Sequence, residues 1–428
     1  MKVIVGEKTY GTIKALTFAP ETALTCDSLP INEFTADLIT PDRVEIGRYA
    51  ELRDDLNKLW AKYWIVYAEH LDEKTLRIRA QSPLKLLDQD VLPATMYEDA
   101  PIEDVLVELF AITGAALGLY IYTLDPSFDG ETVTGFCPEQ TARERLLWVC
   151  FALGAYVRTF FTEGVEILPV DDAEALIPMS DTYWKPSVTF TDHVTAVRVT
   201  AYSFIQGTPS TTDAWVQDAN GVTYIVAEQL LTLRNPEVPA SAPENVVSVE
   251  GVYLLNADNA SGALTRMAQR YFKRIQVDMA AIDNGEYQPG DRVVIYADEA
   301  TLYTGYIEGC DFAFGVQAKA RLRLTGVDPT EAAPLTVTYL WEDMQIGMDN
   351  HVLPVGYEYE LQARFIDLTP DEHRYIFRPT VPVISGTLPE GGAAVTDPCE
   401  IALDHFEGVL EVVSVDGMTE AEGIVTIN

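Results

Sequence analysis

The sequence predicts a mainly β protein with an α/β insert and a further β module toward the C-terminal end. Short segments in which apolar and polar residues alternate, as in half-buried strands, occupy most of residues 1–84 and 179–328. Between them, residues 85–178 contain two stretches with apolar residues at helical spacing, each followed by a strand-like stretch. The length of 428 residues allows two to four domains at roughly 100–200 residues per domain.

Residues 1–84 indicate a small barrel or sandwich. The expected strands alternate apolar and polar residues or are rich in β-branched and aromatic ones. They are Lys2–Val5, Thr12–Phe18, Glu33–Ile39, Leu59–Glu69 and Thr75–Gln81. The aromatic run from Trp60 to Tyr67 is expected in the core, because this is a more common role for such a run than a carbohydrate platform.

Residues 85–178 predict two helices. The first follows Pro101, a residue tolerated in a helical first turn. The second begins at Thr141, whose spacing to Glu144 is that of a capping box, in which each side chain bonds the other's free backbone N–H. Gly154 is expected to end this helix, and a hairpin is expected over residues 156–170. The predicted buried stripe of the second helix consists of Leu146, Leu147, Cys150 and Leu153.

Residues 179–328 predict strands interrupted by one helix, Ser261–Val277. The expected strands are Val188–Phe190, Val194–Ala201, Val222–Ala227, Val293–Ala297, Tyr303–Glu308 and Gln317–Thr325. Gly290 and Asp291 are expected to form the turn that opens a strand, because glycine permits the positive φ of a tight turn. Asp328–Pro334 is predicted to be a linker, and residues 335–428 to be an acidic β module or two.

Acidity dominates the composition. Lys and Arg number 29 and Asp and Glu 66, which gives a net charge of −37, while hydrophobic residues make up 48%. The apolar content excludes disorder for most of the chain, and the acidity disfavours binding to DNA phosphates or anionic membranes. The sequence lacks a membrane-spanning apolar run and the apolar region of a signal peptide. The five cysteines (Cys26, Cys137, Cys150, Cys310 and Cys399) form no CxxC pair, which favours buried thiols and a reducing compartment.

The sequence carries no pattern that is specific for catalysis, metal binding or cofactor binding. No two of the five histidines lie within five positions of each other, so no zinc pair is expected. Asp125, Ser127 and Asp129 partly match a calcium loop, but Phe136 stands where a bidentate glutamate is needed, which favours a plain tight turn. A nucleophile elbow and a phosphate loop are missing. Carboxylate pairs are expected by chance among 66 acidic residues.

One cluster of basic residues lies on the expected helix, mostly opposite its apolar face. It consists of Arg266, Arg270, Lys273 and Arg274. Such a stripe could dock an acidic partner surface or a neighbouring copy of this chain. The alternative is an ordinary solvated helix face.

The order of these segments resembles that of bacteriophage tail baseplate hub proteins, the class shared by contractile tails, late-control D proteins and type VI spike bases. Three stretches carry the resemblance, which spans about residues 1–328. They are the strands of Phe34–Gln81 followed by Ser82–Asp88, the segment Phe136–Pro169, and Ser261–Tyr271 followed by Pro289–Val293 and Tyr303–Ile307. Residues 335–428 do not match the needle or lysozyme extensions of that family.

The resemblance implies two related β-barrel hub domains, residues 1–84 and 179–328, with an α/β domain of residues 85–178 between them. It implies a structural protein and not an enzyme, of which three copies form a ring of six barrels at the tip of the tail tube. Expected partners are tail-tube, distal-tail, tape-measure or spike proteins. The expected location is the virion tail, assembled in the cytoplasm of the bacterial host. An acidic lumen would let DNA pass without binding it.

Two other functions stay open on the sequence. A tail-associated peptidoglycan hydrolase would need a catalytic module in residues 335–428, where zinc-site spacing is missing. A surface β-sandwich protein that recognises carbohydrate would need a signal peptide or an anchor, and neither is visible in the sequence.

Overall fold

The computed structural model describes residues 1–331, except Cys26 and short gaps at 118–121, 172, 178–181, 183–185, 284, 297–300 and 315–318, and eight strands beyond residue 335. The described part is mainly β, as expected, with three α-helices. The chain divides into two compact units. Unit 1 consists of Met1–Ala175, Trp184–Val294 and Thr304–Asp328, and unit 2 of Leu176–Tyr183, Ile295–Tyr303 and Pro329–Asn428.

The first seven strands form an antiparallel run in the order β3-β4-β7-β6-β5-β1-β2. Their bounds are β1 Lys2–Val5, β2 Lys8–Tyr10, β3 Ile13–Phe18, β4 Glu33–Ile39, β5 Tyr49–Arg53, β6 Leu59–His70 and β7 Thr75–Gln81. The five strands expected here are confirmed, and β2 and β5 are additional. Phe34, Ala36 and Leu38 of β4 are fully buried, because alternate side chains of a strand share one face. Of the aromatic run expected in the core, Trp60 and Tyr63 of β6 are buried, whereas Trp64 and Tyr67 are only half-buried.

This run continues into a thirteen-stranded sheet, through Phe18 of β3 opposite Phe312 of β23 (Thr301–Ala313). The further strands are β15 Glu174–Leu176, β16 Ser187–Phe190, β21 Ile275–Ile282, β22 Arg292–Tyr296 and β24 Lys319–Glu331. Five aromatic rings pack around the junction with centroids 4.9–6.5 Å apart: Phe18, Trp60, Phe161, Phe312 and Phe314. Stacked and edge-to-face rings add to the free energy of burial, so this cluster stabilises the join.

The α/β region follows η1, a 3-10 helix at Pro83–Asp88. Its helices are α1 Ile102–Leu117 and α2 Ala142–Leu153; its strands are β8 Val91–Leu92, β9 Thr95–Pro101, β10 Tyr122–Leu124, β11 Thr132–Cys137, β12 Gln140–Thr141, β13 Ala155–Arg158 and β14 Val165–Pro169. The predicted capping box is confirmed: Glu144 N donates to Thr141 Oγ1 at 3.2 Å, and Thr141 N donates to Glu144 Oε2 at 2.9 Å. Gly154 ends α2 with a φ of 80°. The expected hairpin is confirmed as the β13–β14 pair.

The buried stripe predicted for α2 needs correction. Leu147 and Leu153 are only half-buried, whereas Arg145 is fully buried. Its guanidinium has polar partners on several sides: Nη1 donates to the Tyr97 hydroxyl at 3.2 Å, and Nη2 donates to the carbonyl of Pro93 at 2.6 Å. Both terminal nitrogens thus have acceptors, which makes the buried charge tolerable, although Nε is buried without a partner.

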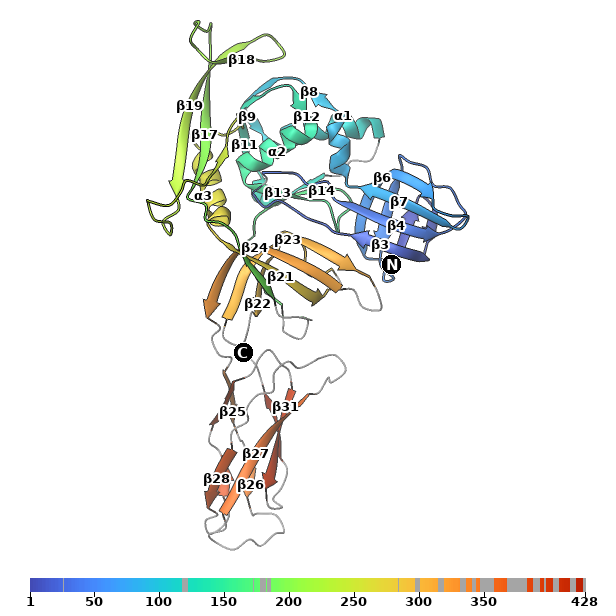
Figure 1. The fold of residues 1–428 in the computed structure, drawn as a ribbon, viewed down its shortest axis with the longest axis vertical. Helices are drawn as coiled ribbons and strands as arrows, with labels where there is room; N and C mark the ends of the chain where they lie inside the picture. The colour runs from blue at the N-terminus through green and yellow to red at the C-terminus, as the bar shows by residue number, and fades with distance from the viewer. Residues whose placement is uncertain are drawn as a thin grey trace. The chain divides into compact units, whose positions relative to one another are not determined.

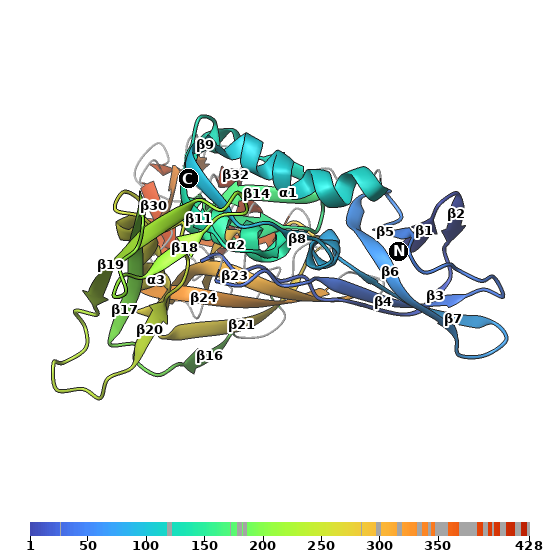
Figure 2. The same cartoon turned by 90° about the horizontal axis from the view of Figure 1, so that it is seen from above.

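A separate sheet has the order β18-β19-β17-β20. Its strands are β17 Ala196–Gln206, β18 Trp215–Gln217, β19 Thr223–Arg234 and β20 Val246–Val249, and α3 (Ala260–Tyr271) follows. Side chains of α1, α2, α3 and β17 share one hydrophobic core. Helices α1 and α2 lie between this sheet and the β1–β7 run in both views (Figures 1 and 2). The strands expected over Val194–Ala201 and Val222–Ala227 correspond to β17 and β19. They belong to this separate sheet and are not hydrogen-bonded into the thirteen-stranded one.

Three other expectations in the second half need correction. The helix expected over Ser261–Val277 ends at Tyr271, and the linker expected from Asp328 begins inside β24. The strand expected over Tyr303–Glu308 extends from Thr301 to Ala313 in β23. In each case residues pair as a strand where the sequence pattern predicted a helix, a linker or the end of a strand, because pairing with a neighbour satisfies their backbone groups. The two related barrels and the domain boundaries stay predictions.

The strands described beyond residue 335 form three small sheets with the orders β25-β30, β26-β29 and β28-β27-β31-β32. They are β25 Thr336–Leu340, β26 Met344–Ile346, β27 Glu358–Asp367, β28 Val383–Thr387, β29 Ala393–Val395, β30 Pro398–Ala402, β31 Gly408–Val415 and β32 Ala421–Val425. This part is β, as expected. Of the described helices, none combines the length and the apolar character that crossing a membrane requires.

Candidate interaction site

The four basic residues predicted to form one stripe do not share a helix face. Arg266 and Arg270 lie on α3, but Lys273 and Arg274 lie between α3 and β21. The helix stops because the residues from Ile275 onward alternate in burial and pair with β16 and β24. The single helical stripe is therefore wrong, although three of its members line one pocket.

All four side chains are half-buried, and each is bonded within the chain. Arg266 donates to Phe151 O at 2.7 Å, and Arg274 donates to Thr191 O at 3.0 Å. Arg270 bonds the Glu308 carboxylate, and Lys273 bonds the Asp328 carboxylate. These contacts hold the side chains in place. Reversing these charges would break the contacts and so disturb the fold. Reversing the charges of a fully exposed stripe would leave the fold intact.

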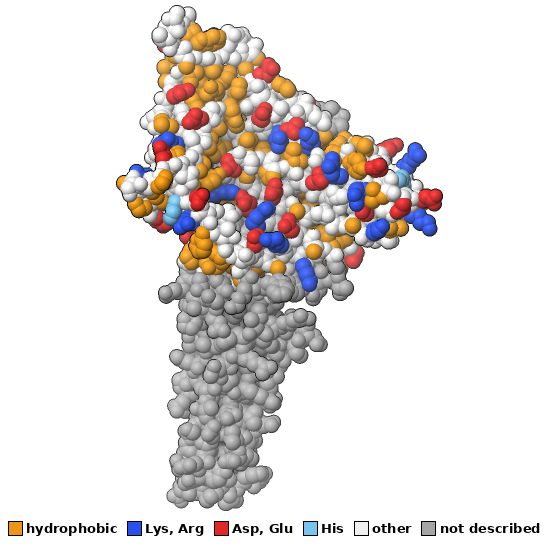
Figure 3. All heavy atoms as spheres, viewed as in Figure 1, with side chains coloured by type: hydrophobic (Ala, Val, Ile, Leu, Met, Phe, Trp, Pro, Cys, Tyr) orange, Lys and Arg blue, Asp and Glu red, His pale blue; other side chains and the backbone are white. Residues whose placement is uncertain are grey.

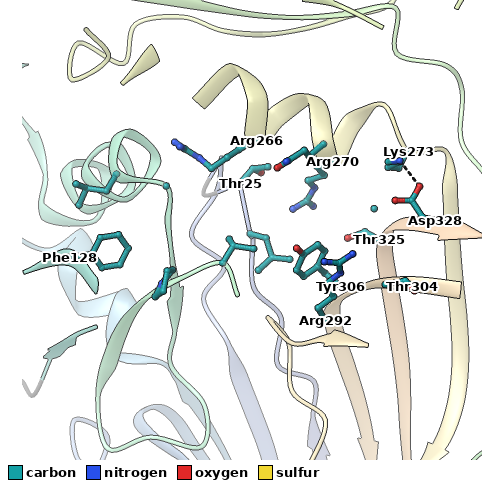
Figure 4. A pocket seen from close by; sticks show the side chains of 17 residues that line it. Thr25, Phe128, Arg266, Arg270, Lys273, Arg292, Thr304, Tyr306, Thr325 and Asp328 are labelled. Carbon is teal, nitrogen blue, oxygen red and sulfur yellow. Dashed lines mark hydrogen bonds and ion pairs between the residues drawn. The ribbon is translucent and has the colours of Figure 1, made fainter. Parts of the chain in front are cut away.

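Arg266, Arg270 and Lys273, together with Arg292 of β22, line a pocket of about 550 Å³ within unit 1 (Figure 4). Ligand pockets have volumes of about 300–1,000 Å³. Its apolar lining comes from Leu24, Phe128, Leu153, Pro169 and Val170, and its hydroxyl groups from Thr25, Thr304, Tyr306 and Thr325. We name this site the cationic pocket.

Arg270 and Arg292 enter the cationic pocket from opposite sides, α3 and β22 (Figure 4). Arg292 Nη2 lies 3.1 Å from Glu174 Oε1, and its guanidinium lies 5.7 Å from the ring centre of Tyr306. Arg270 uses Nη2 to bond Glu308, whereas its Nη1 is buried and has no hydrogen-bond partner. A buried donor without an acceptor costs about 1–3 kcal/mol. Arg270 Nη1 is therefore an unsatisfied donor on a residue that lines the pocket.

Arg292 was not singled out as a site residue from the sequence. The available signal was its place directly after the turn Pro289-Gly290-Asp291. The turn is confirmed: Gly290 has a φ of 109°, and its N–H donates to Ile307 O at 2.8 Å. This bond sets the start of β22 beside β23, which positions Arg292 at the pocket.

Tyr271 is the last residue of α3, and its hydroxyl donates a hydrogen bond to the Asp27 carboxylate. Burial, and then this hydrogen bond, raises the pKa of Tyr271 to about 12. The phenol is therefore protonated at neutral pH and remains a hydrogen-bond donor.

The sequence motifs that partly match metal sites form ordinary structure. Asp125 Oδ1 accepts a hydrogen bond from Ser127 N at 2.9 Å in a tight turn around η2 (Pro126–Phe128), which is the favoured interpretation. Within the described ranges, no three His, Cys, Asp or Glu side chains are grouped closely enough to hold a metal ion. His70 is partly buried and His193 is exposed, while the other three histidines lie outside the described residues.

Three cysteines, Cys137, Cys150 and Cys310, are buried free thiols, as expected. Burial raises the pKa of the Cys137 thiol to about 12, so it stays protonated and is a poor nucleophile at neutral pH. Cys26 lies outside the described residues, and of Cys399 only the backbone, in β30, is described, so the expectation for these two thiols stays a prediction.

Acidic and basic side chains are interspersed over the face drawn in Figure 3, and apolar ones gather over β17–β19. The large exposed apolar residues of these strands are Ile205, Trp215, Leu230 and Leu233.

Comparison with known proteins gives matches in structure only. No family model matches the sequence, and no curated protein matches it. The tail protein from Neisseria meningitidis MC58 has a similar structure, with a TM-score of 0.52 and 13% identity, over 76% of this chain and 95% of that protein. The 43 kDa tail protein of prophage MuSo2 from Shewanella oneidensis matches with a TM-score of 0.51 and 11% identity, over 76% of this chain and 97% of its own.

This chain has the fold of phage tail proteins. The resemblance found in the sequence is thus confirmed at the level of the fold. Almost the whole length of both tail proteins is matched, so the shared architecture is their complete fold and not one small module.

Proposed function

We propose that this chain is a structural hub or adaptor of a phage or phage-like tail, working by shape and assembly and not by catalysis. The observation that carries the proposal is the fold shared with two tail proteins over 76% of the chain. That share is close to the part of the chain that residues 1–328 make up, over which the sequence resembles a hub.

In this proposal residues 1–84 and 179–328 supply two related barrels, residues 85–178 the domain between them, and residues 335–428 an acidic C-terminal β module. Three copies form a ring with six barrels at the tip of the tail tube. The continuity of the thirteen-stranded sheet through β3 and β23 supports this arrangement. It links strands of both regions in one sheet, which in this proposal contributes to the ring wall.

The proposed location is the virion tail, after assembly in the host cytoplasm. Tail-tube, distal-tail, tape-measure or spike proteins are the proposed partners. The net charge of −37 supports a role beside DNA without binding it, because a surface poor in Lys and Arg offers few phosphate contacts.

Sedimentation velocity of the purified full chain, over a range of protein and salt concentrations, tests the proposal. We expect a monomer in dilute low-salt buffer, because self-repulsion extends about 30 Å at 0.01 M salt and about 10 Å at 0.1 M. A trimer should form as protein and salt concentrations rise. A chain that stays monomeric in every condition, including with tail-tube protein added, would contradict the proposal. So would hydrolysis of peptidoglycan by the purified chain.

A further inference from the structure

We propose that the cationic pocket is a socket for the Asp55–Leu56 turn of a second copy of this chain. This inference rests on the proposed function, in which copies assemble, and it names the two surfaces that meet. Asp55 would supply the carboxylate and Leu56 the apolar side chain.

The cationic pocket is suited to a carboxylate. Four cationic side chains line it, against one lining carboxylate, Asp328, in a chain where acidic residues outnumber basic ones by 66 to 29. Arg270 Nη1 is buried beside the pocket without an acceptor. Three of the lining cations, Arg270, Lys273 and Arg292, already bond carboxylates of this chain, which shows that their positions suit such a group. Charge-assisted hydrogen bonds of this kind are the strong ones.

The size and the lining of the cationic pocket favour a peptide segment over a small ion. A volume of about 550 Å³ is far larger than a single carboxylate or phosphate needs. Phe128, Leu153 and Val170 form an apolar part of the lining next to the cations. The best occupant therefore carries an acidic and a large apolar side chain next to each other.

The turn between β5 and β6 presents that combination. Leu56 is 92% exposed, more than any other large apolar residue described, so burying it would be favourable. The neighbouring Asp55 side chain is 88% exposed, and its one ion pair is with the N-terminal amine of Met1 at 3.1 Å. Exposed ion pairs of this kind contribute little, so Asp55 can exchange this partner at small cost.

The turn after β6 offers a matched comparison within the same sheet. Leu71 is 47% exposed and is followed by Asp72. Asp72 Oδ1, however, accepts hydrogen bonds from Lys74 N at 2.8 Å and Thr75 N at 2.7 Å. Its carboxylate is therefore occupied by its own turn, which makes this turn the poorer occupant.

Because the socket and the turn are different surfaces, their contact is heterologous, with the turn of each copy entering the socket of the next. Such a contact closes into a ring when the rotation between copies fits, and otherwise extends into a filament. A closed trimer is the outcome that agrees with the proposed hub.

Self-association constants of the full chain, measured by sedimentation equilibrium, test the contact. We expect Leu56→Ser, Asp55→Asn and Arg270→Gln each to weaken association about tenfold or more. The matched control Leu71→Ser should leave it unchanged. Lys273→Gln is a second socket variant, and thermal melting identifies any variant that has lost its fold.

A double-mutant cycle with Asp55→Asn and Arg270→Gln tests direct contact. If Asp55 and Arg270 are in contact, each single variant already removes their interaction. The double variant should then associate about as strongly as either single variant. Fully additive losses would overturn the contact. A wild-type trimer that Leu56→Ser and both socket variants leave unchanged would refute the socket and leave the hub function standing. A wild type that never associates would refute both.

Discussion

At the scale of single residues, Gly290 shows how one turn depends on the absence of a side chain. Its φ is 109°, and a Cβ atom there would lie 2.6 Å from the Tyr156 hydroxyl oxygen. Gly221 also has a positive φ, 83°, but a Cβ atom there would meet nothing within 4 Å. Comparing substitutions at these two positions therefore distinguishes the cost of backbone strain from the cost of steric conflict.

We expect Gly290→Val to destabilise the protein by about 1–3 kcal/mol from backbone strain and by a further ~1–3 kcal/mol from overpacking against Tyr156. Gly221→Val should show the first effect only. Urea unfolding of both variants checks this. Equal losses for the two would contradict the close packing of Gly290 on Tyr156.

The Asp37–Arg77 pair gives a prediction for acid stability. Arg77 donates Nε to Oδ1 at 2.7 Å and Nη2 to Oδ2 at 2.8 Å. These hydrogen bonds lower the pKa of the Asp37 carboxyl below its ordinary value. The folded pKa is below the unfolded value of about 3.9, so this stabilisation is complete well above pH 4 and is lost as the pH falls through the folded pKa.

Asp37→Asn should therefore reduce the unfolding free energy at pH 7, and the difference from wild type should shrink toward pH 3. Asp278→Asn is the control, because its partner Arg321 has a side chain that is 63% exposed and such pairs contribute little. Urea midpoints at both pH values measure the effect. A difference that does not change with pH would refute the role of the Asp37 charge.

At the scale of single elements, α2 depends on its capping box. Thr141→Ala removes the side-chain acceptor for Glu144 N, and we expect a loss of about 1 kcal/mol. Thr265→Ala is the control: the Thr265 hydroxyl donates to Ser261 O within α3 and caps nothing, so its removal should be nearly neutral. Thermal melting of both variants gives the comparison, and equal effects would contradict the capping role.

The same element shows a limit of pattern reading. The cap at Thr141 and the stop at Gly154 could be predicted, since both depend on neighbouring residues. The burial of Arg145 could not, because its hydrogen-bond acceptors on Pro93 and Tyr97 lie about fifty positions earlier in the sequence. A charged residue inside an apolar stripe carries no sign of such distant partners.

At the scale of the whole molecule, the strands through β24 should suffice for folding of the first part of the chain. A chain that ends at Glu331 keeps every strand of the thirteen-stranded sheet. We expect its main thermal transition within about 3 °C of the corresponding transition of the full chain. A chain that ends at Arg321 loses Leu322, Leu324 and Val327, all buried, and should not fold. Loss of the cooperative transition in the longer chain would contradict the expectation.

The sequence alone determined the features that depend on local chemistry: most strands, the cap and end of α2, the turn at Gly290, the acidity and the order of segments that resembles a hub. These follow from neighbouring residues and the period of apolar side chains. The tertiary structure decided how the segments combine. In the structure β3 pairs with β23 through Phe18 and Phe312, and β17–β20 form a separate sheet. Three residues of the expected basic stripe line a pocket instead. Long-range strand pairing, and the position of Arg270 and Arg292 in one pocket, depend on which distant surfaces can bury one another. A local sequence pattern contains no information about that choice.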